Sequence, residues 1–199
     1  SVGQGTGVGG FLGLDEPNLF GQGKRGKLQW QFGRNISDFD LSYTDPALYG
    51  SRISGTFGVH NTRIRYTIAD LGRIRTRGAS VQLGFPLPRS LYSRVFSSYA
   101  IEFESYSGAS RGLTGSFRCA NCVRSTVGLS FLRDTRIDLP FATGGSMHSV
   151  GANLTGGVLG GSATFQKYDF EGRWYAPAGR LGGGPAGSGV RFVLGLTTR

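Results

Sequence analysis

The chain has 199 residues, a formal net charge of +10 and 35 glycines, and 12% of its residues are aromatic. The composition excludes collagen, because the glycines follow no three-residue period, and argues against disorder, because apolar residues recur in strand-like patterns. No run of about 18 apolar residues occurs, so no transmembrane helix is predicted, although the strands of a membrane barrel would give a much weaker signal.

Ten segments alternate apolar and polar residues with the two-residue period of a β-strand. In the second of them, for example, Leu28, Trp30 and Phe32 fall on one face and polar residues on the other. Turn signals rich in Gly and Pro separate the segments, and longer or more polar connections are expected near 62–77, 105–124 and 157–163. The ten expected strands are 7–14, 27–34, 38–45, 52–60, 79–87, 94–105, 126–131, 149–156, 166–177 and 189–199.

The faces of these segments decide between a soluble sandwich and a membrane barrel. A sandwich of this size needs a large inner core shared by two sheets. Here one face is rich in aromatic residues, while Lys167, Asp169, Glu171 and Arg173 form a ladder of opposite charges on the other face of one strand. This ladder suits a watery lumen and the aromatic face suits lipid, so the sequence predicts an all-β, antiparallel up-and-down transmembrane barrel over residues 1–199.

The apolar side chains expected to face lipid come from the second to the fifth and from the ninth of these segments. They are Trp30, Phe32, Phe39, Leu41, Tyr43, Phe57, Val81, Leu83, Tyr168, Phe170 and Trp174. Open strand edges are close to forbidden in a bilayer, so the chain either closes on itself or is part of a longer barrel. Its first residues, SVGQGTGVGG, carry no signal-peptide pattern, which indicates a mature or truncated chain.

The excess of positive charge has two interpretations. A basic protein can bind nucleic acid, or its basic loops can face an anionic lipid surface. The arginines are scattered between apolar segments rather than gathered on one element, and this spacing disfavours nucleic acid. These arginines are Arg63, Arg65, Arg73, Arg75, Arg77, Arg111, Arg118 and Arg124.

Candidate sites of catalysis or metal binding are weak. Cys119 and Cys122 are too few for zinc, which needs about four ligands, and no helix follows a strand as a redox motif requires, so a loop disulfide is expected. The Gly-rich stretch 182–189 lacks the Lys-Ser/Thr of a phosphate-binding loop and is predicted to be a flexible turn. Asp38, Asp40 and the acids of 134–138 have no supporting base or nucleophile. No catalytic residue, cofactor or metal ligand is therefore predicted.

Other polar residues are interpreted as structural. Asn18, Gly21 and Gly23 are expected to set a tight turn, and Asp45 and Pro46 belong to another. Arg133, Asp134 and Arg136 are expected to form a local ion network at the rim of the barrel.

The turns and strands, taken in order, resemble the BamA superfamily of outer-membrane assembly barrels. The resemblance covers nearly the whole chain, and it is the ordered series rather than any one motif that is specific. The matching stretches are NLFGQGKRGKLQWQFG (18–33), DFDLSYTDPALYGSRISGTFGVHN (38–61), RGASVQLGFPLPRSLYSRVFSSYAIE (77–102), VGLSFLRDTRIDLPFATGGSMHSVGANLTG (127–156), YDFEGRWYAP (168–177) and VRFVLGLTTR (190–199).

The resemblance implies about strands two to eleven of a sixteen-strand barrel. In that family POTRA domains and a first strand come before this region, and a lumenal loop with an Arg-Gly-Phe/Tyr motif and closing strands come after it. Lys167, Asp169, Glu171 and Arg173 would meet that loop in the lumen, and the turns at Asn18, Gly21, Gly23, Asp45 and Pro46 would be periplasmic.

The resemblance further implies a non-enzymatic insertase of a Gram-negative-type outer membrane. Its partners would be unfolded β-barrel clients, accessory lipoproteins and outer-membrane lipid, with lipopolysaccharide as a candidate and no nucleic acid. Two alternatives stay open: a porin or two-partner secretion translocator, and a soluble basic β-protein that binds nucleic acid or glycans.

Overall fold

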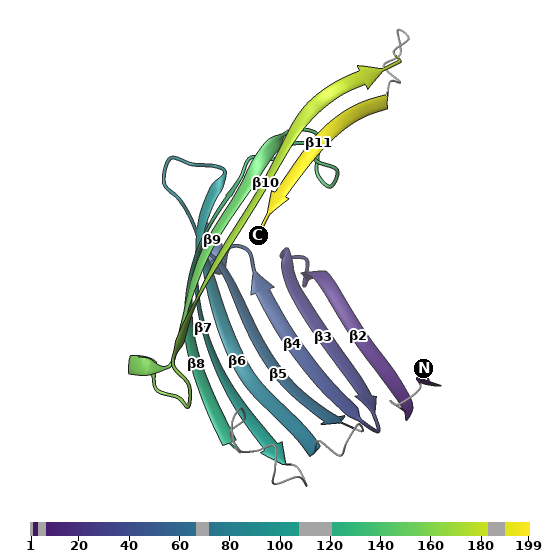
Figure 1. The fold of residues 1–199 in the computed structure, drawn as a ribbon, viewed down its shortest axis with the longest axis vertical. Coiled ribbons are helices and arrows are strands. Elements are labelled where there is room, and N and C mark those ends of the chain that lie inside the picture. Colours follow the sequence, from purple (N-terminus) through teal and green to yellow (C-terminus); the bar gives the residue numbers. More distant parts are fainter. Residues whose placement is uncertain (1, 4–6, 67–71, 108–120, 183–189) are drawn as a thin grey trace.

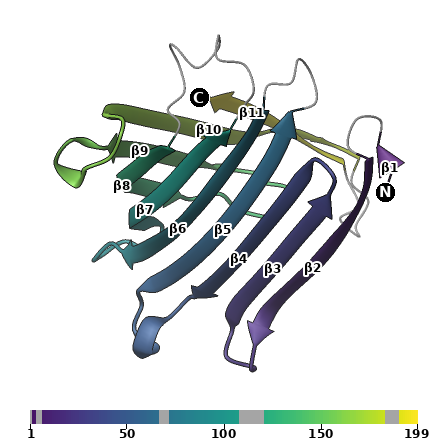
Figure 2. The same cartoon turned by 90° about the horizontal axis from the view of Figure 1, so that it is seen from below.

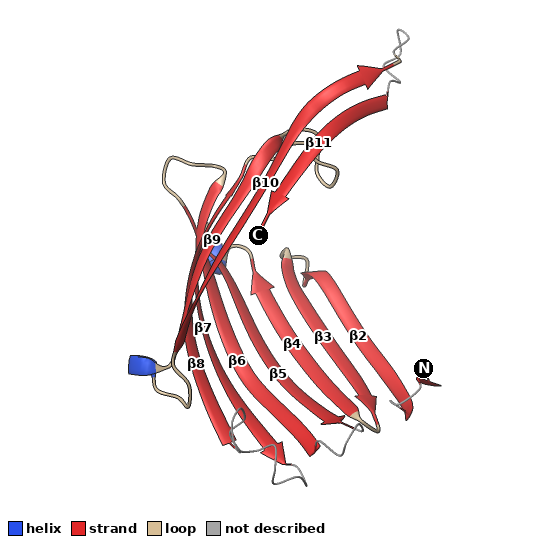
Figure 3. Ribbon diagram, in the orientation of Figure 1, coloured by secondary structure: helices blue, strands red, loops and turns tan. Residues whose placement is uncertain are grey.

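The structure is a computed structural model that describes residues 2–3, 7–66, 72–107, 121–182 and 190–199. Over these residues the chain is almost entirely β-strand, with two single-turn 3-10 helices, Leu48–Gly50 and Gly157–Leu159 (Figure 3). The strands are β1 (Val2–Gly3), β2 (Gly7–Leu19), β3 (Lys24–Gly33), β4 (Ile36–Asp45), β5 (Ser54–Tyr66), β6 (Gly72–Pro86), β7 (Ser93–Ser107), β8 (Asn121–Asp134), β9 (Gly145–Thr155), β10 (Phe165–Leu181) and β11 (Val190–Thr198).

These strands form one sheet in which each strand pairs with its neighbours in sequence. The order is β1 through β11, and every pair is antiparallel. The sheet curves along its whole width, so that β2 and β11 lie on the same open side of the curve without meeting (Figures 1 and 2). The architecture is therefore an up-and-down antiparallel sheet curved like part of a barrel wall, which confirms the predicted fold class.

Strands β2 to β11 correspond to the ten segments predicted from alternation, but several are longer. The expectation of a long polar connection near 62–77 is wrong, because β5 continues to Tyr66 and β6 begins at Gly72. The Arg-Ile-Arg runs at 63–65 and 73–75 keep the two-residue period and pair with each other across the two strands. The polar composition of this stretch therefore belongs to a continuing ladder rather than to a loop.

The sheet has almost no interior. Among the described residues Met147 is the one buried hydrophobic side chain, at 8% exposure, whereas many large apolar side chains are exposed. A sheet this apolar on its surface needs an apolar medium to cover it, because burial of apolar area is the main stabilising contribution to folding. No helix among the described residues is long and apolar enough to cross a membrane.

Candidate functional site

The strand register assigns the side chains to two faces of opposite character. One row crosses β3 to β7 as Leu28, Leu41, Val59, Ala79 and Ile101, and we call the face that carries it the apolar face. The adjacent row of paired residues, displaced by one residue on each strand, is Gln29, Asp40, His60, Gly78, Glu102 and Arg124. We call the face that carries this second row the polar face. The alternation follows from the pleat of a strand, which sends successive side chains to opposite sides.

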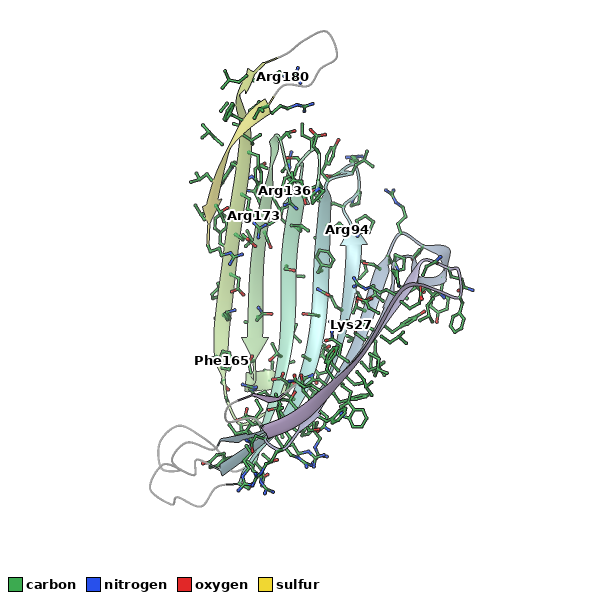
Figure 4. The ribbon with its side chains drawn as sticks, turned by 90° about the vertical axis from the view of Figure 1, so that its right-hand side faces the viewer. Lys27, Arg94, Arg136, Phe165, Arg173 and Arg180 are labelled. Carbon is green, nitrogen blue, oxygen red and sulfur yellow. The ribbon has the colours of Figure 1, made fainter. Side chains whose placement is uncertain are left out.

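All eleven side chains expected to face lipid lie on the apolar face, by the same register. This face also carries a shallow recess of about 540 Å³, whose lining includes Leu129, Phe131, Val150 and Phe170. Figure 4 looks into the hollow of the sheet and shows Lys27, Arg94 and Arg173, all of which belong to the polar face. The polar side chains thus line the concave side and the apolar ones the convex side.

The charged ladder of β10 forms two ion pairs on the polar face. The Lys167 ammonium lies 2.8 Å from the Asp169 carboxylate. Arg173 donates from Nε and Nη2 to Glu171 Oε1, at 2.8 and 2.6 Å, and Arg199 donates to the same oxygen at 3.3 Å. Because residues two apart on a strand share a face, opposite charges at this spacing pair within the strand.

A separate ion pair lies at the turn end of β8, close to this ladder. Arg136 donates from Nε and Nη2 to the two oxygens of Asp134, at 2.9 and 2.7 Å. Hydrogen bonding to the Asp134 carboxylate, with a smaller contribution from Tyr175, raises the pKa of the Arg136 guanidinium, which lies outside the strands. Arg133 does not join this pair: its register places it on the apolar face, so the expected three-residue network is wrong.

A third polar cluster was not predicted. Glu102 lies 2.8 Å from Arg124 and 3.7 Å from His60, and Glu104 lies 3.7 Å from Arg124. These residues come from β5, β7 and β8, and only the pairing register brings them together. The period-two pattern would have assigned each to the polar face of its own strand, but not to one another.

The predicted tight turn is present between β2 and β3. The Asn18 carbonyl accepts a hydrogen bond from the Gly21 N–H at 3.0 Å, and the Asn18 side-chain oxygen accepts one from the Gly23 N–H at 2.6 Å. Both glycines have positive φ, +71° and +67°, which suits residues without a Cβ.

The turn after β4 is held by Asp45, which is buried. Its Oδ1 accepts a hydrogen bond from the Ala47 N–H at 2.9 Å, and its Oδ2 lies 3.4 Å from the Lys24 ammonium. Pro46 follows directly after the strand ends, where its missing N–H costs nothing. Connections β2–β3, β4–β5, β6–β7 and β8–β9 all lie at one end of the up-and-down sheet.

Of the two cysteines in the predicted loop disulfide, the structure describes only Cys122. Cys122, the second residue of β8, is disulfide-bonded. Cys119 falls in a segment that the structure does not describe, as do Arg111 and Arg118, so the pairing of Cys119 with Cys122 stays a prediction. Most of the Gly-rich stretch 182–189 is likewise outside the described ranges.

No metal centre is found in the part of the chain that the structure describes, where no three His, Cys, Asp or Glu side chains could hold one ion. Asp38 accepts a hydrogen bond from the Thr62 hydroxyl at 2.5 Å, across the β4–β5 pair. The candidate functional surfaces of the described residues are therefore the two faces of the sheet.

Comparison with known families agrees with this geometry. The family model described as the Omp85 superfamily domain matches residues 18–196. The chain belongs to the Omp85 superfamily. Members of this superfamily are outer-membrane β-barrels, and the curved Omp85 sheet described above is part of such a wall.

Individual relatives are more distant. One relative is sorting and assembly machinery component 50 homolog A of Xenopus laevis, to which this Omp85 chain is 25% identical over 169 residues. The alignment covers 80% of this chain and 34% of that protein. The Xenopus tropicalis homolog is 24% identical with the same coverage. A crystal structure of BamA from Haemophilus ducreyi lacking POTRA domains 1–3 superposes with a TM-score of 0.62 at 16% identity, covering 89% of this chain and 36% of that one. The chain thus spans about a third of the proteins it matches.

Proposed function

We propose that this chain is the wall of an outer-membrane assembly barrel that folds and inserts β-barrel client proteins. The observation that carries the proposal is the match of residues 18–196 to the Omp85 domain, on a curved antiparallel sheet with an uncovered apolar face. The names of its relatives, a sorting and assembly machinery component and BamA, support assembly as the activity.

The proposed mechanism is physical rather than chemical. A client strand that enters a bilayer must satisfy every backbone N–H and C=O, because lipid offers no hydrogen-bonding partner. An exposed strand edge of the barrel supplies those partners by β-augmentation. A polar lumen and a lipid-facing wall hold that edge at membrane depth, and no step of this process requires a catalytic residue or a cofactor.

The experiment that tests this uses the intact protein inserted into liposomes. A urea-unfolded barrel protein is diluted into these liposomes and into empty ones, and its folded fraction is followed by the mobility shift of unboiled samples on a gel. Faster folding with the protein present supports the proposal, and equal rates would overturn it. Large steady ion conductance without faster folding would favour the porin or translocator alternative.

The proposed partners follow from the same placement. Unfolded barrel clients would meet a strand edge, and lipid the apolar face; accessory lipoproteins belong to the proposal through the resemblance alone. We further propose that Lys167, Asp169, Glu171 and Arg173 face a lumenal loop, and that Asn18, Gly21, Gly23, Asp45 and Pro46 lie at the periplasmic side. The relatives include both an animal and a bacterial protein, so a Gram-negative-type origin is a proposal too.

Charge reversal on β10 tests the lumenal role. Asp169→Lys with Glu171→Lys removes the partners of Lys167, Arg173 and Arg199, and we expect slower client folding. Exposed ion pairs contribute only about 0.2–1 kcal/mol each, so the barrel itself should still fold. The matched control is the swap Lys167→Asp with Asp169→Lys, which preserves the pair and should retain the wild-type rate. If the reversal leaves both barrel stability and client folding unchanged, the ladder has no lumenal role.

A further inference from the structure

Five arginines gather on the apolar face at one end of the β5–β6 hairpin. The register places Arg63 opposite Arg75, and Arg65 opposite Arg73, while Arg77 lies opposite Asn61. We call these five arginines the basic patch. In the sequence they look scattered, since residues 66–72 separate the two halves, but the antiparallel pairing folds one half onto the other.

Among the described residues, the basic patch has no carboxylate partner. Like charges directly opposite each other across two strands repel and destabilise the pair. Within the described ranges, no carboxylate lies at ion-pair distance from any of the five arginines, and Arg75 donates only to the neutral Asn61 side chain, at 3.2 Å. The described acids at this end, Asp38, Glu102 and Glu104, belong to the polar face and have partners there. The described part of the chain therefore presents these five cations without a carboxylate of its own beside them.

The patch directly borders the apolar surface. Moving along the hairpin, Val59 and Ala79 form the last apolar cross-strand pair, followed by Asn61 with Arg77 and then by Arg63 with Arg75. Phe103 lies opposite Arg77 on β7 and is half exposed, at 50%. An apolar band that ends in an exposed aromatic and then in cations is the order of groups found where acyl chains give way to headgroups.

A hollow in the surface adjoins the patch. It has a volume of about 220 Å³, and four arginines line it: Arg34, Arg63, Arg65 and Arg73. Its remaining lining, residues 33 and 35–37, comes from the end of β3, the β3–β4 turn and the start of β4. A guanidinium offers a planar fork of N–H donors that matches phosphate oxygens, so several of them around one recess suit a phosphate group.

From this geometry we propose that the basic patch binds the phosphate of an anionic membrane lipid, with the acyl chains of that lipid on the adjoining apolar face. The inference rests on the proposed function, because it requires the apolar face to be in lipid. It adds a specific binding site at one end of β5 and β6, and the chemical class of its ligand, a phosphate-bearing lipid headgroup.

The test measures binding of phosphatidylglycerol to the intact, detergent-purified protein. Thermal unfolding is followed while mixed micelles containing phosphatidylglycerol, or phosphatidylcholine of the same chain length, are titrated in. We expect phosphatidylglycerol to stabilise the wild type more than phosphatidylcholine does. Because the variant Arg63→Gln/Arg73→Gln/Arg75→Gln removes three of the five cations, it should bind phosphatidylglycerol at least about tenfold more weakly than the wild type.

A matched control removes the same charge elsewhere. Arg52, Arg94 and Arg180 are exposed and have no ion pair among the described residues, and none lies in the patch. Their triple substitution by Gln should retain wild-type binding of phosphatidylglycerol. Equal loss in both triple variants, or no loss in the patch variant, would overturn the proposal.

Two further measurements distinguish a lipid headgroup from other sources of phosphate. Inorganic phosphate at the same concentration should not reproduce the stabilisation, and if it does, the site takes a free anion rather than a lipid. A duplex oligonucleotide that stabilises the wild type more than the lipid does would assign the patch to nucleic acid and reject the lipid. Client folding is measured on the same preparations, so that the two proposals can fail separately. Lipid binding without faster client folding contradicts only the assembly function. Faster client folding without lipid binding contradicts only the proposed lipid site.

Discussion

Val81→Arg is expected to lower the free energy of unfolding of the membrane-inserted protein by about 2–4 kcal/mol, the cost of a cation on the lipid face near the bilayer midplane. Val81 lies on the apolar face between Phe57 and Tyr99, and 41% of its surface is exposed. An arginine there would have to leave lipid or draw water toward it. Reversible unfolding in urea, with the protein in liposomes, measures the loss.

The neighbouring residue supplies the control for this prediction. Gln82 follows Val81 on the same strand, is exposed, and points to the polar face, where it lies opposite Thr56 and Ser98. Gln82→Arg should change the free energy of unfolding by no more than about 0.5 kcal/mol, as for other substitutions at exposed polar sites. Similar losses in the two variants would show that the apolar face is not the one in contact with lipid.

Gly156→Ala is expected to be at least as damaging and to act through the backbone. Gly156 follows β9 with φ +73° and ψ −146°, a conformation that is essentially limited to glycine. A Cβ at this position would overlap the Ala163 carbonyl oxygen, so the connection between β9 and β10 would have to move. We expect a loss of more than about 3 kcal/mol, or failure to fold, seen as a missing folded band on a gel of unboiled protein.

Gly160 provides a control that distinguishes the steric clash of an added Cβ from the strain of the backbone conformation. It lies in the same connection with nearly the same φ, +72°, and with ψ 173°, but a Cβ added there would have no atom within 4 Å. Gly160→Ala should therefore cost only the conformational strain, about 1–3 kcal/mol. If the two variants are equally stable, the close approach of residues 156 and 163 is not a constraint in the folded protein.

The strands and their faces could be predicted from local sequence. Alternation at the two-residue period is a local property, so Leu28, Trp30 and Phe32 could be assigned to one face without knowledge of their neighbours. The same local logic predicted the tight turn of Asn18, Gly21 and Gly23 and the ladder from Lys167 to Arg173, whose members lie within one strand.

Which residues of different strands meet, and in which register, became known only from the folded chain. The contact of His60 and Arg124 with Glu102, and the gathering of Arg63, Arg65, Arg73, Arg75 and Arg77, depend on pairings between residues distant in sequence or across a turn. A slip of one residue would send a whole strand's side chains to the opposite face, so composition cannot reveal such clusters. Arg133 shows that proximity in sequence does not imply contact, because it follows Leu132 and precedes Asp134 but lies on the opposite face from Asp134. The pleat of a strand places neighbouring side chains on opposite faces, whereas the register brings together residues that are far apart in sequence.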